Sequence, residues 1–206
     1  MPSILNCCPL PAFTETPNSA CADNIGQIVE VMFALEAQTF ATAAAFGTKA
    51  TVVAAKTALD VKALPYVNAA VITPSAPTEI YGVGTNDTAF GRSLHAKTNN
   101  PSTFTAMFYD LTAAQVESMR EIACLGAGYR AYFRTNDDKL IYDNTAGGGV
   151  VRGFKIYDAT FTSVQVDGLN ATNKYAMSFQ LDAFWEEDRS TTTPVDYAFE
   201  SWISLT

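Results

Sequence analysis

The chain has 206 residues, 48% of them hydrophobic, and a formal net charge of −8. That length and apolar content are sufficient for one domain with a buried core, which excludes a wholly disordered chain. The negative charge argues against a surface that binds nucleic acid, because such surfaces neutralise phosphates with Lys and Arg. The sequence has no apolar run of about 18 residues that would span a bilayer and no signal peptide, so we expect a soluble chain made in the cytoplasm, without a membrane partner.

The chain is expected to begin with an irregular arm and to continue as one β domain. Residues 1–24 contain four prolines and several Asn, Ser and Thr, which suit irregular structure. A first strand is predicted in IGQIVEVMFAL, where Val29, Val31, Phe33 and Leu35 share one face and Ile28, Glu30 and Met32 the other. We therefore assign residues 1–24 to the arm and residues 25–206 to a single β domain.

An insertion rich in Ala and Thr is expected at about residues 36–77. It has few large apolar residues and no strong periodicity, although a short helix between Ala55 and Leu64 fits the sequence. We expect it at the periphery, outside the main core, as an elaboration or as an arm that docks on a neighbour.

The middle of the chain predicts a strand, a helix and a hairpin. In STFTAMFYD, Phe104, Ala106 and Phe108 alternate with other residues, as in a strand. The only clear helix follows: Thr112 and Gln115 fit a capping box, and Gly126 ends it. Its apolar stripe consists of Val116, Met119, Ile122 and Ala123. After it, the turn residues Asn136, Asp137 and Asp138 predict a hairpin.

The last third predicts a long two-faced strand. From Lys174 the odd positions are apolar (Tyr175, Met177, Phe179, Leu181, Ala183 and Trp185), and the even positions are polar or small as far as Asp182. Period two indicates one buried face. Twelve residues would extend about 40 Å, well beyond an ordinary strand, so we expect a bulged strand or one shared with neighbours. A last strand is expected within PVDYAFESWISLT, and the fold class is mainly β with one packed helix.

No catalytic, cofactor or metal motif stands out in the sequence. His95 is the only histidine and has no recognisable nucleophile, and the glycine runs lack the spacing of nucleotide-binding loops. Asp137 and Asp138, like the acidic run 186–188, are expected in solvated turns rather than in a calcium loop. The cysteines (Cys7, Cys8, Cys21 and Cys124) are expected to be buried free thiols rather than zinc ligands. We therefore expect a structural protein and not an enzyme.

Three segments together resemble the tail tube (major tail) proteins of bacteriophages. CADNIGQIVEVMFAL is similar to their opening strand, with Cys21, Gly26 and Ile28 at its start. LTAAQVESMREIACLGAGYRAYFRTNDDKLIY has the order of their helix and hairpin, and ATFTSVQVDGLNATNKYAMSFQLDAFW looks like their closing part. The resemblance covers the first strand and most of residues 102–188, whereas the segment 36–77 has no counterpart.

The resemblance implies a β-sandwich with one helix that assembles, in six copies, into rings. Stacked rings would form a virion tail tube, and long strands from several subunits would form an inner barrel through which the genome is ejected. On that basis we expect Lys174, Ser178, Gln180 and Asp182, with Ala176, to face the lumen, while the odd-numbered residues pack inside. Copies of itself and other tail proteins are the expected partners, and DNA would pass without specific binding.

Two other functions remain open at this stage. A capsid decoration protein or neck adaptor of a phage would also be mainly β and without catalytic residues. A carbohydrate-binding module or divergent hydrolase would need exposed aromatic residues, for which Trp185, Tyr197 and Trp202 are the candidates.

Overall fold

The computed structural model describes residues 26–74, 78–81, 95–98, 100–125, 128–165, 173–183 and 185–206. For residues 78–81, 95–98 and 163–165 it describes the backbone alone. The expected arm at residues 1–24 and the closing glycine of the helix, Gly126, lie outside the described residues.

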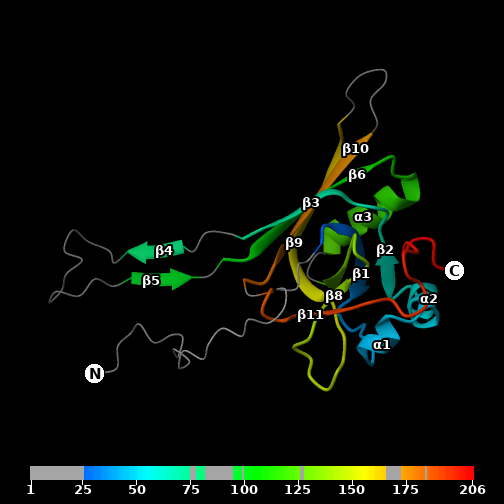
Figure 1. Cartoon of the computed structure of the whole chain (residues 1–206). Coiled ribbons are helices and arrows are strands. Elements are labelled where there is room, and N and C mark those ends of the chain that lie inside the picture. Colours follow the sequence, from blue (N-terminus) through cyan, green and yellow to red (C-terminus); the bar gives the residue numbers. More distant parts are fainter. Residues whose placement is uncertain are drawn as a thin grey trace.

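Antiparallel strands dominate the described residues, which confirms the mainly β class (Figure 1). The strands are β1 (Ile28–Leu35), β2 (Val61–Ala63), β3 (Asn68–Thr73), β4 (Thr78–Tyr81), β5 (His95–Thr98), β6 (Ser102–Tyr109), β7 (Tyr129–Thr135), β8 (Leu140–Asp143), β9 (Phe154–Gln165), β10 (Lys174–Leu181) and β11 (Arg189–Thr192). The helices are α1 (Ala43–Phe46), α2 (Lys49–Thr57) and α3 (Ala113–Leu125). Strands β4 and β5 pair only with each other and extend away from the rest of the fold (Figure 1).

One sheet forms both layers of a sandwich because β9 belongs to each of them. The start of β9 pairs with β7 through Phe154 and Lys155, and the remainder pairs with β10. Within the part that pairs with β10, Asp158 has a φ of 47°, and the register against β10 shifts between Ser178 and Gln180. Such a β-bulge bends and twists a strand. The first layer therefore holds β11, β8, β7, β1 and β2, and the second holds β9, β10, β6 and β3.

The chain between β2 and β3 connects the layers on the opposite side. The backbone N–H groups of Leu64 and Val67 donate hydrogen bonds to the carbonyls of Val31 and Val29 in β1, at 3.1 and 2.8 Å. The same segment then continues into β3, which pairs with β6 in the second layer. The two layers are thus linked at both sides, as the predicted sandwich requires.

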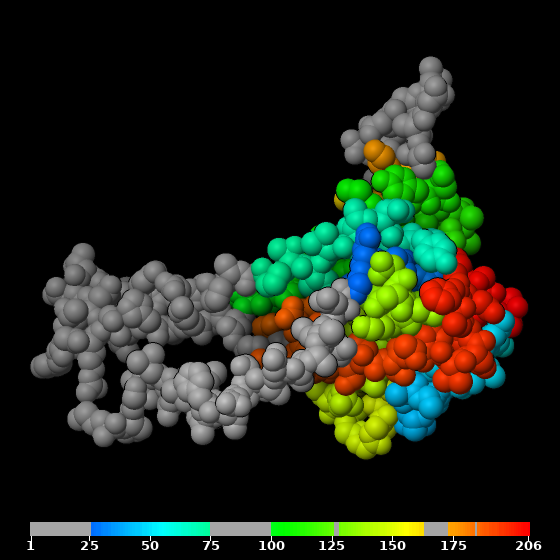
Figure 2. Space-filling model, in the orientation of Figure 1, coloured from blue at the N-terminus to red at the C-terminus, as the bar shows by residue number. Residues whose placement is uncertain are grey.

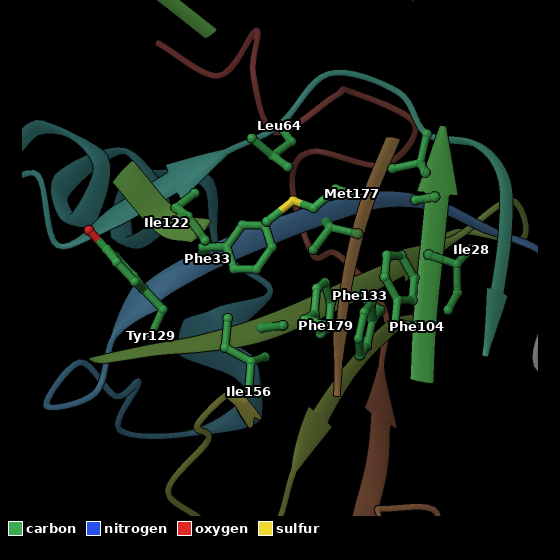
Figure 3. Close-up of a cluster of buried hydrophobic side chains, with 14 of the residues drawn as sticks. Ile28, Phe33, Leu64, Phe104, Ile122, Tyr129, Phe133, Ile156, Met177 and Phe179 are labelled. Carbon is green, nitrogen blue, oxygen red and sulfur yellow. The ribbon is translucent and has the colours of Figure 1, made fainter. Parts of the chain in front are cut away.

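Aromatic rings fill the main core between the layers (Figure 3). The ring of Phe104 from β6 lies 4.6 Å from that of Phe179 in β10 and 5.4 Å from that of Phe133 in β7, measured between centroids. All three side chains are almost fully buried. Rings from both layers therefore interlock, and burial of side chains of this size dominates core energetics.

Helix α3 begins and packs as the sequence predicts. The backbone N–H of Gln115 donates to Oγ1 of Thr112 at 3.3 Å, and the backbone N–H of Thr112 donates to Oε1 of Gln115 at 2.8 Å. This reciprocal pair is a capping box. Val116, Met119 and Ile122 are buried in the main core.

The segment 36–77 is not peripheral, contrary to the expectation from its composition. Phe40, Phe46 and Val52 are buried in a second core on the outer side of the first layer, against Met32 and Tyr132. Helices α1 and α2 carry this packing, and α2 ends at Thr57, earlier than the helix expected between Ala55 and Leu64. Although the segment is rich in small residues, Phe40 and Phe46 supply large side chains, and the sheet supplies further large partners. The expected single helix is thus joined by two shorter ones.

The C-terminal segment 193–206 completes this second core without forming the expected last strand. Its backbone forms turns, while Tyr197, Trp202 and Leu205 are buried. The last strand of the described chain is β11, before this segment. Figure 2 shows the segment (red) running across the surface beside the helices α1 and α2 (cyan).

Candidate functional site

Strand β10 has the two faces that its sequence predicts. Tyr175, Met177, Phe179 and Leu181 are buried in the main core, whereas Lys174, Ala176, Ser178 and Gln180 are only partly buried. The strand is shorter than predicted, because it ends at Leu181. The backbone N–H of Trp185 then bonds to the carbonyl of Asp182 at 3.2 Å, and this turn brings Trp185 into the core. The longest strand is instead the bulged β9, with 12 residues.

The outward side of the second layer is a continuous four-stranded surface, here called the open face. The strand registers place its side chains in rows: Thr73, Thr103, Gln180 and Tyr157; Val71, Thr105, Ser178 and Thr160; Met107, Ala176 and Thr162; and Tyr109 beside Lys174. Three of the four residues expected to face a lumen, Lys174, Ser178 and Gln180, lie on it. Asp182 follows β10 and lies at the end of the face, where it lines a recess with Gln180.

Hydroxyl groups dominate the middle of the open face. Oγ1 of Thr160 and Oγ of Ser178 lie 2.7 Å apart, and Oγ1 of Thr162 donates to the carbonyl of Ala176 at 3.1 Å. Met107 and Val71 add exposed apolar surface, at 45% and 52% exposure. A shallow hollow of about 270 Å³ lies above the small side chains at its centre.

Charge is confined to the two ends of the open face. Lys174 lies at one end, and Asp158 and Asp182 lie at the other. There, burial raises the pKa of the Tyr157 hydroxyl, and the neighbouring carboxylate of Asp182 raises it further. An uncharged strip of hydroxyl and small side chains therefore separates Lys174 at one end from Asp158 and Asp182 at the other, where Nζ of Lys155 also lies 5.5 Å from the centre of the Tyr157 ring.

No described element packs on the central hollow of the open face, unlike the two sides of the first layer. The first layer packs against the main core on one side and the second core on the other. By contrast, every residue that lines the central hollow belongs to β3, β6, β9 or β10. No other element of the described chain covers that hollow.

Sequence reasoning missed the contributions of β3, β6 and β9 to this surface. Thr103, Thr105 and Met107 alternate with buried residues in STFTAMFYD, and Thr160 and Thr162 do so in ATFTS. The alternating threonines were a visible signal. Their assembly beside Ser178 depends on strand pairing and on the bulge in β9, neither of which the local pattern specifies.

Several other candidate residues lie elsewhere than expected. Asp138 is in the predicted hairpin turn, but only 7% of it is exposed, because it pairs with Arg134. Cys124 is a free thiol, but it is exposed rather than buried. Asp137 and the acidic residues 186–188 are exposed or lie in turns, as expected. Cys7, Cys8 and Cys21 and the side chain of His95 lie outside what the structure describes.

The aromatic residues considered for a sugar-binding platform are buried. Trp185, Tyr197 and Trp202 are 5%, 1% and 0% exposed, and each packs in one of the two cores. A sugar platform needs exposed ring faces, so these three residues cannot form one. The observation removes the basis on which a carbohydrate-binding module was considered.

Neither a metal cluster nor a membrane-spanning helix is found in the described part of the chain. Among those residues no three His, Cys, Asp or Glu side chains lie together in a metal-binding arrangement. None of the described helices has the length and apolar character needed to cross a membrane.

Comparison with known proteins finds weak structural similarity to chains of gene transfer agent particles and to the Hcp protein. No protein-family model matches the sequence, and a search of curated proteins finds no match. A chain of the virion of a native gene transfer agent particle is 11% identical with a TM-score of 0.35, over 66% of this chain and 91% of that one.

Two further solved structures show similarity of the same weak degree. A chain of the tail of an empty gene transfer agent particle, with C6 symmetry, is 8% identical with a TM-score of 0.34, over 66% of this chain and 87% of that one. The Hcp protein is 13% identical with a TM-score of 0.30, over 81% of this chain and 99% of that one. Similarity this weak does not establish a function, which is therefore derived below from the chain's own geometry.

Proposed function

We propose that this chain is a structural subunit of a phage-like tail tube, without enzymatic activity. Copies associate into rings, rings stack into a tube, and the open face of β3, β6, β9 and β10 lines the channel through which the genome leaves. The observation that carries the proposal is the open face, which is uncharged at its centre and whose central hollow no described element covers, on a sandwich whose other layer is covered on both sides.

The chemistry of the open face suits a surface along which DNA slides. Phosphates are bound mainly by Lys and Arg, so a surface of Thr, Ser, Ala and Gln holds them weakly. The net charge of −8 adds repulsion. Lys174 at one end is the single cation among the open-face residues defined above, and Asp182 lies at the other end.

The free edges of the sandwich support association between copies. Among the described strands β3 pairs only with β6, so its other edge is unpaired. Unpaired edges promote association with further strands, and closed barrels remove them. We propose rings of six copies, as the resemblance to tail tube proteins implies, located in the virion tail with other tail proteins as partners.

Negative-stain electron microscopy over a concentration series tests the proposal. We expect rings with an open centre that stack into tubes. A chain that stays monomeric at every concentration, binds assembled capsids and decorates them would overturn the proposal in favour of a decoration protein.

Introducing a positive charge then tests which surface lines the channel. Gln180→Lys puts a cation on the open face, and we expect tubes to form while DNA ejection slows at least several-fold. Gln38→Lys makes the same change in the loop after β1 and should leave ejection unaffected. Equal effects from both variants would contradict the assignment of the open face to the lumen.

A further inference from the structure

The C-terminal segment presents one aromatic ring to solvent on a strained backbone. Phe199 is 78% exposed, and its φ is 60°. This left-handed conformation is unfavourable for a residue with a bulky side chain, and strain of this kind concentrates at functional sites. Neither burial nor backbone preference explains why a phenylalanine occupies the position.

Buried polar groups hold the backbone on both sides of Phe199. Its N–H donates to Oδ2 of Asp138 at 2.9 Å, and Asp138 in turn accepts from Nε of Arg134 at 2.6 Å. Arg134 also donates to the carbonyls of Tyr197 and Glu200. The ring of Phe199 is therefore presented from a fixed backbone, which lowers the entropy cost of binding a partner.

A second exposed aromatic residue faces the same recess. Tyr66 is 57% exposed and, with Phe199, lines a cleft of about 210 Å³, here called the aromatic cleft. Its remaining walls are Val29, Glu30, Arg134, Thr135, Asn136 and Asp138. Paired exposed rings beside buried polar groups are typical of sites that bind extended, proline-containing peptides.

This chain contains such a peptide, and the described chain begins at the rim of the cleft. The N–H of Asn136, a wall residue, donates to the carbonyl of Gln27 at 2.9 Å, so the first 25 residues precede this point. Residues 1–14 have no charged side chain and include Pro2, Pro9 and Pro11. The sequence PLPAF, residues 9–13, combines proline with apolar side chains that match an aromatic groove.

We propose that the aromatic cleft of one copy binds the segment 9–13 of a second copy. The inference rests on the proposed function, which places copies side by side. Fully extended, the 13 residues from Phe13 to Gly26 reach about 43 Å. A domain of this size is about 40 Å across. The segment thus has the length to reach the equivalent cleft on a neighbour.

Photo-cross-linking between isotopically mixed copies tests the proposal. Full-length chains carrying Phe199→p-benzoyl-phenylalanine, half of them labelled with ¹⁵N, are mixed, irradiated and digested. We expect cross-links from position 199 to residues 9–13 that join labelled to unlabelled chains. The same photoreactive residue at Val195, which is 69% exposed but does not line the cleft, is the control.

The other outcomes of the cross-linking distinguish failure of this inference from failure of the proposed function. Cross-links to residues 9–13 within the same chain would assign the cleft to its own segment, and cross-links to another surface would assign a different partner. Tubes without cross-links would refute the inference while leaving the proposed function intact. Cross-links between copies in a sample that forms no rings or tubes would support the inference and refute the proposed function.

A substitution that keeps the backbone provides an independent test. Asn tolerates the left-handed region better than most residues, so Phe199→Asn removes the ring while preserving the fold, as an unchanged melting temperature would show. A fluorescent peptide of residues 1–16 should bind the Asn variant at least tenfold more weakly than wild type. Equal binding to both chains would refute a role for Phe199.

Discussion

The guanidinium of Arg134 lies 3.3 Å from the carboxylate of Glu30, and both side chains are almost completely buried. Glu30 also accepts hydrogen bonds from the hydroxyl of Ser201 and from the N–H of Trp202, at 3.3 Å for the latter. The pair thus connects β1 and β7 with the C-terminal segment. Removing one member of a buried pair leaves an uncompensated buried charge, which is strongly destabilising. The intact pair therefore holds the C-terminal segment against β1 and β7.

Replacing Glu30 with Gln is expected to change how stability depends on pH. Burial is the largest influence and raises the pKa of Glu30 above its ordinary 4.5, although the bonds from Ser201, Trp202 and Arg134 act in the opposite direction. A raised pKa means that the folded state binds the proton more tightly. The resulting stabilisation is complete below pH 4.5 and is lost as the pH rises through the raised pKa.

Urea unfolding of wild type and Glu30→Gln between pH 3 and 8, a range that extends below the ordinary carboxyl pKa of 4.5, measures this effect. The difference in the free energy of unfolding, wild type minus variant, should fall with rising pH, by about 1.4 kcal/mol per unit of raised pKa. Glu121→Gln is the control, because the bond to Lys62 lowers the pKa of Glu121 and the difference should then rise with pH. A flat profile for Glu30→Gln would show that Glu30 titrates as in the unfolded chain.

Lys56 is expected to hold the C-terminal segment against α2. Its Nζ donates to the carbonyls of Trp202, Ile203 and Leu205, at 2.8, 3.2 and 2.6 Å. Lys56→Met leaves these carbonyls without that donor and should lower stability by about 1–3 kcal/mol. Hydrogen exchange should accelerate most in residues 201–206.

Lys49→Met is the matched control for this prediction, since both lysines belong to α2. Lys49 pairs with Glu200 at 2.9 Å, but both side chains are about one-third to one-half exposed, at 34% and 49%. A pair this exposed contributes about 0–1 kcal/mol. Equal losses for the two variants would contradict a specific role for Lys56.

The elements with strong local signals were predictable from sequence, and their connections were not. The alternation of β10, the capping box at Thr112 and the turn at Asp138 are each specified by neighbouring residues. The burial of Phe46 and Trp202 depends instead on the outer side of the first layer. The local sequence pattern did not indicate which residues cover that side. Small helical residues gave too weak a periodicity to reveal that second core.

The candidate site was predictable to a similar extent. The outward orientation of Lys174, Ser178 and Gln180 follows from the two-residue period of β10 alone. The identity of their neighbours on β9 depends on the bulge at Asp158. A bulge reverses which residues face outward, and no turn residue such as Gly marks this one. The aromatic cleft could not be predicted from the sequence, because Tyr66 and Phe199 are brought together only by the tertiary fold.

Gly153 lies where a side chain has no room. A Cβ at this position would lie 2.9 Å from Cβ of Arg130 and 3.0 Å from the carbonyl oxygen of Ala131. Gly153→Ala should therefore push β7 away from the start of β9 and lower stability by about 1–3 kcal/mol. Gly128→Ala, where a Cβ would have open space, should have little effect on the melting temperature. Equal melting temperatures for both variants would contradict the close approach of these strands.

Adjacent substitutions in β10 test its register against the core. Phe179→Ala removes a ring that stacks on Phe104 at 4.6 Å and meets Phe33 at 5.6 Å, so it should cost about 3–5 kcal/mol. Ser178→Ala loses only the exposed contact with Thr160 and should change stability by about 0.5 kcal/mol or less. A slip of one residue would exchange the two faces and reverse this order. Urea unfolding of the two variants therefore decides whether Ser178 belongs to the open face, on which the proposed channel depends.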